Sequence, residues 1–461
     1  MLFSSIPFLY YFLPAVLAVY FLMPTRGKNG VLLLSSLIFY GWGEPKLLLL
    51  MVFTIAMFYL CGLAIGRAGE RRQKKFWLTV SVVISLGLLG LFKYADFFIG
   101  SINTLTGLSI PFLRLALPVG ISFYTFQCLS YTIDVYRGNV PAQKDPVAFG
   151  AYVALFPQLI AGPIVRYVDV ARELENRTTG WEDVYAGLRR FLAGLCKKVL
   201  LADNLALLAA LCRETAEPSV LSAWLYAVGF AFQIYFDFSG YSDMAIGLGR
   251  IFGFHFIENF NYPYLSKSIT EFWRRWHMSL GSWFRDYVYI PMGGNRVSRG
   301  RWVFNILTVW MLTGLWHGAA WNFVLWGLLY AAFLLLEKWV PSLQRLPAAA
   351  RHGYTMLVVI LGFVLFNAST LGRAAGEMGS LFGFGGLPAV SAHSLYCLRS
   401  YALLLAVACF GATPAPKKAF SALENTGFGP VISLFFMAAA LLLCTAYLVD
   451  GSFSPFLYFR F

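Results

Sequence analysis

The sequence predicts an all-α polytopic membrane protein with about eleven transmembrane helices. Hydrophobic residues make up 59% of the 461 residues and charged residues only 13%, whereas about a quarter of the residues in soluble domains are charged. Apolar runs near the length of a membrane-spanning helix recur from one end of the chain to the other. We interpret residues 1–461 as a single membrane domain, with a motif-bearing core over about residues 117–337.

The net charge of +14 does not indicate a nucleic-acid-binding protein. The basic residues occur in short clusters between apolar runs, without the continuous basic face that a phosphate backbone requires. Such clusters are typical of cytoplasmic loops and of contacts with membrane lipids. The seven cysteines are scattered and lack metal-ligand spacing, so we expect neither a metal site nor a disulfide framework.

The N-terminal segment predicts a retained first span. Met1–Met23 is apolar almost from its first residue and has no basic start and no small-residue cleavage site before Pro24. Arg26 and Lys28 follow it, and a second basic cluster occupies residues 67–75. Applied to these two loops, the positive-inside rule predicts an extracytoplasmic N-terminus for a multi-pass protein of the cell (inner) membrane.

Further apolar runs are candidate spans, although several are shorter than a full crossing. They lie near residues 76–93, 147–162, 219–236, 302–315, 320–337, 354–367, 399–411 and 429–448. Residues 338–353 and 412–428 contain Pro, Lys and Arg and are predicted to be surface loops.

Four other segments mix aromatic residues with Asp, Arg, Asn, Gln and Gly. They are residues 117–137, 157–171, 233–265 and 266–296. Irregular backbone exists at membrane depth only where protein or water surrounds it. We therefore predict a broken, funnel-like interior with re-entrant and interfacial helices. The chain has no internal repeat, which argues against many secondary transporter architectures.

Residues 268–296 carry the densest motif. At helical spacing, one face of this segment collects Trp273, Trp276, His277, Leu280 and Phe284. Glu271 is spaced to pair with Arg274 or Arg275. The segment is either an interfacial amphipathic helix held by tryptophans, or a cytoplasmic mouth whose arginines receive a phosphate or a pantetheine arm. The arginines of this mouth would be Arg274, Arg275, Arg285 and Arg296.

Asp237 and Asp243 end an apolar run within residues 233–243. A serine beside a glycine suggests a hydrolase elbow there, but the required Gly-x-Ser-x-Gly pattern is absent. We expect the two carboxylates to accept hydrogen bonds that fix a buried loop, and to pair with the arginines of residues 268–296. Residues 122–137 and 157–166 either line a channel or supply hydrogen bonds between spans.

His317 lies within the apolar segment 312–321, where an ionisable side chain is costly and usually functional. Gly314 and Gly318 could let another backbone or an elongated substrate pass close to the imidazole. A neutral imidazole is a good general base near pH 7, although a satisfied structural histidine is the alternative. We interpret His255, His352 and His393 as structural.

Several motifs occur together in this chain: Phe-Trp-Arg-Arg-Trp-His at 272–277, Asp-Tyr-Val-Tyr-Ile-Pro at 286–291 and Thr-Gly-Leu-Trp-His-Gly at 313–318. With residues 157–163 and 237–243, this set resembles the membrane-bound O-acyltransferase family, and its alginate O-acetyltransferase branch in particular. The resemblance implies a ring of membrane helices around a thin constriction that substrates reach from both faces. It makes His317 the catalytic histidine and His277 the second signature position.

The implied reaction moves an acyl group, most simply acetyl, from a cytoplasmic thioester to hydroxyls of an extracytoplasmic polysaccharide, directly or through a secreted hydrolase-like partner. The donor would be acetyl-CoA or a carrier-bound phosphopantetheine thioester. It acts as a substrate, so we expect no tightly bound cofactor. Asn322 and nearby Tyr or Trp side chains are candidate oxyanion donors. The predicted substrate-binding residues are Arg274, Arg275, Trp276, Arg285, Asp286, Asn295, Asp237, Asp243, Trp316 and Asn322.

Two other functions fit the same features. A D-alanyl transferase that decorates teichoic acids would take its acyl group from a carrier protein through a similar tunnel. A transporter of acyl groups or glycans would also need intramembrane charges and an aqueous path, although the single histidine motif and the lack of repeats argue against it.

Overall fold

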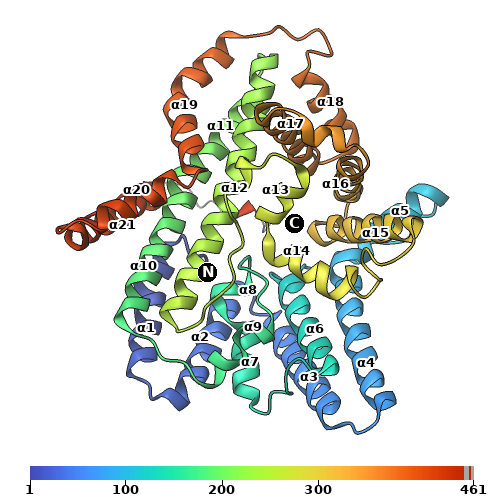
Figure 1. Cartoon of the computed structure of the whole chain (residues 1–461), viewed down its shortest axis with the longest axis vertical. Helices are drawn as coiled ribbons and strands as arrows, with labels where there is room; N and C mark the ends of the chain where they lie inside the picture. The colour runs from blue at the N-terminus through green and yellow to red at the C-terminus, as the bar shows by residue number, and fades with distance from the viewer. Residues whose placement is uncertain (451–455, 458–461) are drawn as a thin grey trace. The chain divides into compact units, whose positions relative to one another are not determined.

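The computed structural model describes residues 1–450 and 456–457, and these are almost entirely helical (Figure 1). The one β-bridge among them joins Phe260 to Trp276. Seven described helices are long and apolar enough to cross a membrane, and a shorter apolar helix covers Phe8–Leu22. The all-α membrane class is therefore confirmed, but the predicted number of eleven spans is not.

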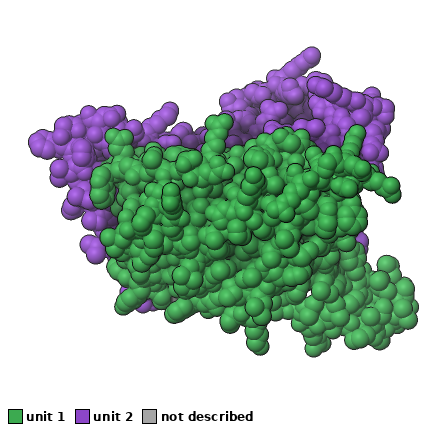
Figure 2. Space-filling model, turned by 90° about the horizontal axis from the view of Figure 1, so that it is seen from below, with its two compact units in different colours: residues 1–191, 242–257 green, residues 192–241, 258–461 purple. Residues whose placement is uncertain are grey.

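The chain divides into two compact units (Figure 2). Unit 1 comprises Met1–Phe191 and Ser242–Ile257, and unit 2 comprises Leu192–Tyr241 and Glu258–Phe461. Two of the three unit boundaries fall within helices, which are α10 (Trp181–Cys196) and α12 (Val220–Ile251), and the third follows Ile257 in a non-helical segment. The interpretation of the chain as one domain stays a prediction.

Unit 1 contains the N-terminal spans and a set of short buried helices. They are η1 (Phe8–Phe12), α1 (Leu13–Leu22), η2 (Thr25–Gly27), α2 (Lys28–Gly43), α3 (Leu48–Arg67), α4 (Arg71–Leu89), η3 (Gly90–Tyr94), α5 (Ala95–Thr106), α6 (Ile121–Arg137), α7 (Pro146–Ala154), α8 (Phe156–Leu159) and α9 (Tyr167–Glu175). Helices α3, α4 and α6 pack against one another.

Helix α6 shows that most of residues 117–137 are regular, contrary to the predicted irregular backbone. Its polar side chains lie inside unit 1, where hydrogen bonds to neighbouring elements allow a helix to form. The hydroxyls of Ser81 and Thr132 are 3.0 Å apart, and Tyr152 donates to the carbonyl of Gln127. The hydrogen bond between α4 and α6 therefore explains why a polar residue occurs at position 132. Residues 157–171 are partly irregular between α8 and α9, as predicted.

Unit 2 contains the histidine motifs. Its remaining elements are η4 (Lys197–Ala202), α11 (Asp203–Arg213), η5 (Pro263–Leu265), α13 (Ile269–Arg275), α14 (Met278–Phe284), η6 (Arg285–Tyr289), α15 (Arg299–His317), α16 (Trp321–Trp339), η7 (Pro341–Arg345), α17 (Ala348–Asn367), α18 (Leu371–Leu381), α19 (Ala392–Gly411), α20 (Ala415–Glu424) and α21 (Gly429–Asp450). The predicted surface loops at 338–353 and 412–428 are thus partly helical.

Helix α12 corrects a second expectation, because residues 233–251 continue a helix instead of forming a buried loop. A long helix tolerates carboxylates at buried positions when each has a cationic partner. Asp237 pairs with Lys198, and Asp243 pairs with Arg190. Because both carboxylates have cationic partners, the backbone of α12 can stay helical through this polar segment.

Candidate active site

His277 lies at a break between two short helices, so the prediction of one amphipathic helix within residues 268–296 is wrong. Helix α13 ends at Arg275, and α14 begins at Met278. His277 itself has φ 46°, a left-handed conformation that costs free energy for a residue with a Cβ. Because of this break, the residues from Trp273 to Phe284 do not lie on one face of a continuous helix, as helical spacing predicted. The orientation of the His277 imidazole is therefore not set by the axis of α13.

The segment before α13 holds this kink in place. Asn261 N–H donates to Arg275 O at 2.9 Å, and Met278 N–H donates to Asn259 O at 3.0 Å. The side chain of Asn259, which is fully buried, accepts from the N–H and the hydroxyl of Ser279. These bonds on both sides of His277 stabilise its strained backbone.

The other end of α13 is anchored by a carboxylate from α16. Glu337 accepts from Ile269 N–H at 2.5 Å, from Thr270 N–H at 3.0 Å and from the Thr270 hydroxyl at 2.7 Å. A negative charge at a helix N-terminus satisfies otherwise unpaired N–H groups and complements the helix dipole. Glu337 thus ties α13, and with it the chain leading to His277, to α16.

His317 is the last residue of α15, and glycines bring α16 close to it. A Cβ atom at Gly314 would overlap the backbone carbonyl of Phe323, and a Cβ at Gly318 would overlap the Phe323 ring. At Gly327, a Cβ would overlap the carbonyl of Trp310. The backbone that passes close to the histidine motif is therefore that of α16.

The two histidines lie near each other in a buried aromatic environment. Their ring centroids are 6.2 Å apart, and their exposed fractions are 2% for His277 and 3% for His317. The His317 ring meets Trp326 edge-on at 5.0 Å and Phe366 at 5.3 Å. His277 lies outside the candidate membrane spans, and burial lowers its pKa to about 3. Its imidazole is therefore neutral at pH 7.

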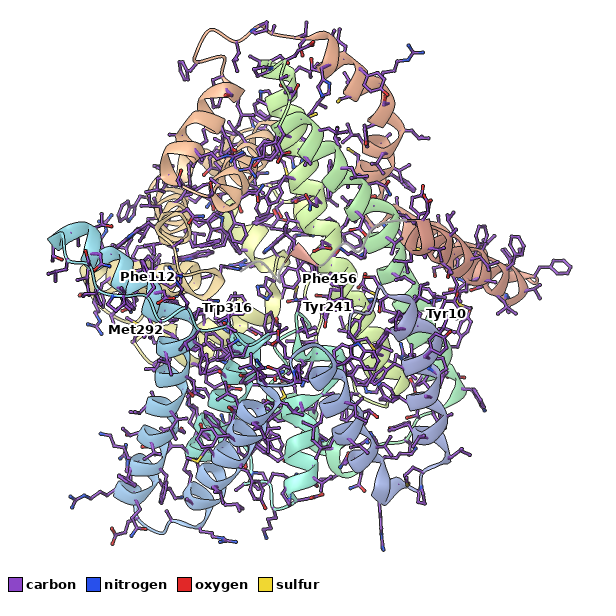
Figure 3. The ribbon with its side chains drawn as sticks, turned by 180° about the vertical axis from the view of Figure 1, so that it is seen from behind. Tyr10, Phe112, Tyr241, Met292, Trp316 and Phe456 are labelled. Atoms are coloured by element: carbon purple, nitrogen blue, oxygen red, sulfur yellow. The ribbon has the colours of Figure 1, made fainter. Side chains whose placement is uncertain are left out.

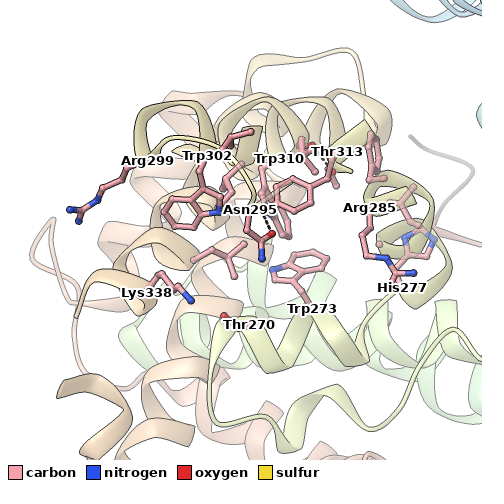
Figure 4. A pocket seen from close by; sticks show the side chains of 18 residues that line it. Thr270, Trp273, His277, Arg285, Asn295, Arg299, Trp302, Trp310, Thr313 and Lys338 are labelled. Carbon is pink, nitrogen blue, oxygen red and sulfur yellow. Dashed lines mark hydrogen bonds between the residues drawn. The ribbon is translucent and has the colours of Figure 1, made fainter. Parts of the chain in front are cut away.

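A cavity of about 640 Å³ reaches this region within unit 2 (Figure 4). Among its lining residues His277, Leu280, Phe284 and Thr313 are buried, three tryptophans are half-buried, and Arg285, Asn295, Arg299 and Lys338 are exposed. Arg285 lies beside His277, whereas Arg299 and Lys338 lie at the opposite end of the cavity. None of the 18 lining residues is acidic. His277 lines this cavity, whereas His317 does not.

The arginine cluster predicted from the sequence is only partly brought together. Arg285 lines the cavity and pairs with Asp286 at 2.7 Å. Arg274 and Arg275 do not line it. Arg275 pairs with Glu271 at 2.9 Å, as its spacing predicted, and Arg274 is exposed.

The aspartates of α12 have other partners than the arginines of residues 268–296. Asp237 lies 2.7 Å from Lys198 Nζ and accepts from Leu457 N–H at 2.6 Å. Nearby, the Tyr241 and Phe456 rings are 4.8 Å apart (Figure 3). Asp243 lies 2.6 Å from a terminal nitrogen of Arg190. A substrate-binding role for either carboxylate stays a prediction.

The other predicted residues differ in what they contact. Asn295 lines the cavity and accepts from Tyr289. Trp316 lies next to both histidines, with its ring 5.6 Å from His277. Trp276 packs in the aromatic core. The side-chain nitrogen of Asn322 donates to the carbonyls of Phe366 and Ala368, so it ties α16 to the end of α17.

Sequence reasoning missed several cavity residues. Lys338 falls in a predicted surface loop, and Arg299 precedes an apolar run. Helical spacing could have found the inner wall, because one face of α15 presents Trp302, Ile306, Val309, Trp310 and Thr313 to the cavity.

Comparisons with known proteins identify the family of this chain. Residues 34–375 match the model of the membrane-bound O-acyltransferase family. The chain is 41% identical to a probable alginate O-acetylase of Azotobacter vinelandii, over the full length of both proteins. It is 34% identical to a peptidoglycan O-acetyltransferase of Helicobacter pylori, over 84% of this chain and 81% of that protein.

A teichoic acid D-alanyltransferase of Bacillus subtilis is 31% identical over 54% of this chain and 67% of its own length. The extent of the family match, together with the full-length similarity to the first relative, decides the assignment. The chain belongs to the membrane-bound O-acyltransferase family, which confirms the predicted multi-pass membrane acyltransferase.

Proposed function

We propose that this enzyme transfers an acetyl group from a cytoplasmic thioester to hydroxyls of an extracytoplasmic alginate-like polysaccharide. The observation that carries the proposal is the full-length similarity to a probable alginate O-acetylase, combined with the paired histidines of unit 2 beside a cavity. The acceptor receives the group directly or through a secreted hydrolase-like partner. The protein resides in the inner membrane with its N-terminus outside.

The cavity suits a phosphate-bearing thioester, such as acetyl-CoA or a carrier-bound phosphopantetheine. Three of its lining residues, Arg285, Arg299 and Lys338, are exposed and cationic, and none of its lining residues is acidic. Arginine and lysine bind phosphate oxyanions through charge-assisted hydrogen bonds. The buried, mostly apolar part accommodates a pantetheine arm and excludes water from the thioester.

His317 acts as the general base in this proposal. Its imidazole takes the proton of the acceptor hydroxyl as the oxygen attacks the thioester carbonyl, a contribution of about 10²–10⁴-fold for a well-placed base. His277, which lines the cavity, contacts the donor side of the reaction. No metal takes part. Holding donor and acceptor at adjoining histidines supplies the remaining rate enhancement through orientation.

D-alanyl transfer from a carrier protein to teichoic acid is the second candidate, because a teichoic acid D-alanyltransferase also matches part of the chain. Mass spectrometry of envelope polysaccharides from strains with and without the gene distinguishes acetyl transfer from D-alanyl transfer. Loss of O-acetyl esters on deletion, restored by the intact gene, supports acetyl transfer. Loss of D-alanyl esters with unchanged acetyl content would overturn it.

Removing the cationic cavity residues is expected to weaken donor binding. Arg299→Gln with Lys338→Gln should raise the KM for the thioester about tenfold with kcat nearly unchanged, because the phosphate contacts are the same in the ground state and the transition state. The measurement is thioester hydrolysis and transfer by purified enzyme at varied donor concentration. Arg274→Gln, an exposed arginine outside the cavity, is the matched control. An unchanged KM in the double variant would contradict donor binding in this cavity.

A further inference from the structure

Three buried hydrogen-bond donors form a cluster that contacts His317 through Trp326. They are the indole nitrogens of Trp273 and Trp326 and the hydroxyl of Tyr330, and within the described residues none of these atoms has a hydrogen-bond partner. The Trp326 ring lies 5.5 Å from Trp273 and 5.2 Å from Tyr330. Buried polar groups normally have a partner, so a cluster of three such donors needs an explanation.

Trp326 connects the cavity wall to His317. It lies on α16, is only 1% exposed, and meets the His317 ring edge-on at 5.0 Å and 82°. Its other neighbour, Trp273, lines the cavity. An acyl group that passes from the cavity to His317 would therefore meet the Trp326 side chain.

Packing accounts for an aromatic ring at position 326 but not for its N–H group. A phenylalanine would fill an apolar site without a buried donor, whereas an N–H that lacks an acceptor costs about 1–3 kcal/mol. Asn322, one turn earlier on α16, has already committed its amide nitrogen to the carbonyls of Phe366 and Ala368. The indole of Trp326 and the hydroxyl of Tyr330, both on this helix, lack an acceptor within the described residues, and Trp326 is favoured because its ring contacts that of His317.

We propose that the indole N–H of Trp326 donates a hydrogen bond to the carbonyl oxygen of the acyl group during transfer. This inference rests on the proposed function. The acceptor oxygen forms a bond to the carbonyl carbon while His317 takes its proton, and the carbonyl electron pair moves to the oxygen that faces Trp326. Collapse of this intermediate breaks the C–S bond, and the thiolate leaves with the proton from His317.

The test removes the N–H without changing the shape of the side chain. Benzothienylalanine, in which sulfur replaces the indole N–H, is introduced at position 326 by nonsense suppression. Loss of one oxyanion donor typically lowers kcat by about 10²–10³-fold. We expect that loss per mole of purified, folded enzyme, with the KM for acetyl-CoA nearly unchanged. The same substitution at Trp224, whose indole donates to Leu381 O in the structure, controls for the incorporation and should leave kcat unchanged.

Two results would overturn the assignment. The first is full kcat in the Trp326 analogue. The second is a Tyr330→Phe variant that loses the activity while the Trp326 analogue keeps it, which would move the donor to the neighbouring hydroxyl. Either outcome leaves the proposed function standing as long as His317→Ala abolishes transfer. Normal transfer by His317→Ala would instead remove the general-base role of His317 on which this inference depends, and unchanged O-acetyl esters after gene deletion would remove the proposed function.

Discussion

His317→Ala is expected to lower acetyl transfer by about 10²–10⁴-fold, the contribution of a well-placed general base, at normal abundance in the membrane. The imidazole lies at the end of α15 and is 3% exposed. Water cannot readily replace its base function there. The measurement is the O-acetyl content of envelope polysaccharide, together with protein level by immunoblot.

His352→Ala is the matched control, because this half-buried histidine contacts Ser266 O and lies outside the cavity. It should retain transfer. Unchanged transfer by His317→Ala at normal abundance would contradict the catalytic assignment and revive a transport function. If His277→Ala alone abolished transfer, the roles of the two histidines would be reversed.

Lys198→Met is expected to destabilise the enzyme by about 3–5 kcal/mol, the usual cost of removing one partner from a buried ion pair. Lys198 is 2% exposed at its side chain and lies 2.7 Å from Asp237 and 2.8 Å from Asp203. The substitution leaves the buried Asp237 carboxyl group without its cationic partner. The measurement is thermal unfolding of the purified protein in detergent.

The double variant Lys198→Met with Asp237→Leu removes both buried charges, and it should recover most of the lost stability, because apolar residues often replace a buried ion pair at little cost. Its activity then tests the predicted role of Asp237. A stable, active double variant assigns Asp237 to structure alone. Wild-type stability in the Lys198→Met single variant would contradict the ion-pair account.

The sequence was sufficient for the parts of the site that depend on local chemistry. An ionisable side chain in an apolar run marked His317, and two glycines four residues apart marked a close backbone approach, which α16 makes. Helical spacing predicted that Glu271 pairs with Arg274 or Arg275, and the structure pairs it with Arg275.

Features that depend on distant segments could not be predicted in this way. The break at His277 is stabilised by Asn259 and Asn261, and helical periodicity carries no information about such partners. The carboxylate Glu337 lies 67 and 68 residues away from the two N–H groups it caps. Asp237 pairs with Lys198 from another element, so α12 remains helical where composition alone predicted a loop.

Transfer by inverted membrane vesicles tests the central claim most directly, because these vesicles retain any envelope partner and expose the cytoplasmic face to added [14C]acetyl-CoA. The account predicts alkali-labile label on lumenal polysaccharide or protein in vesicles with the wild-type enzyme, and its loss in vesicles that contain an equal amount of the His317→Ala protein. Equal ester-linked label with both proteins would contradict a catalytic role for His317.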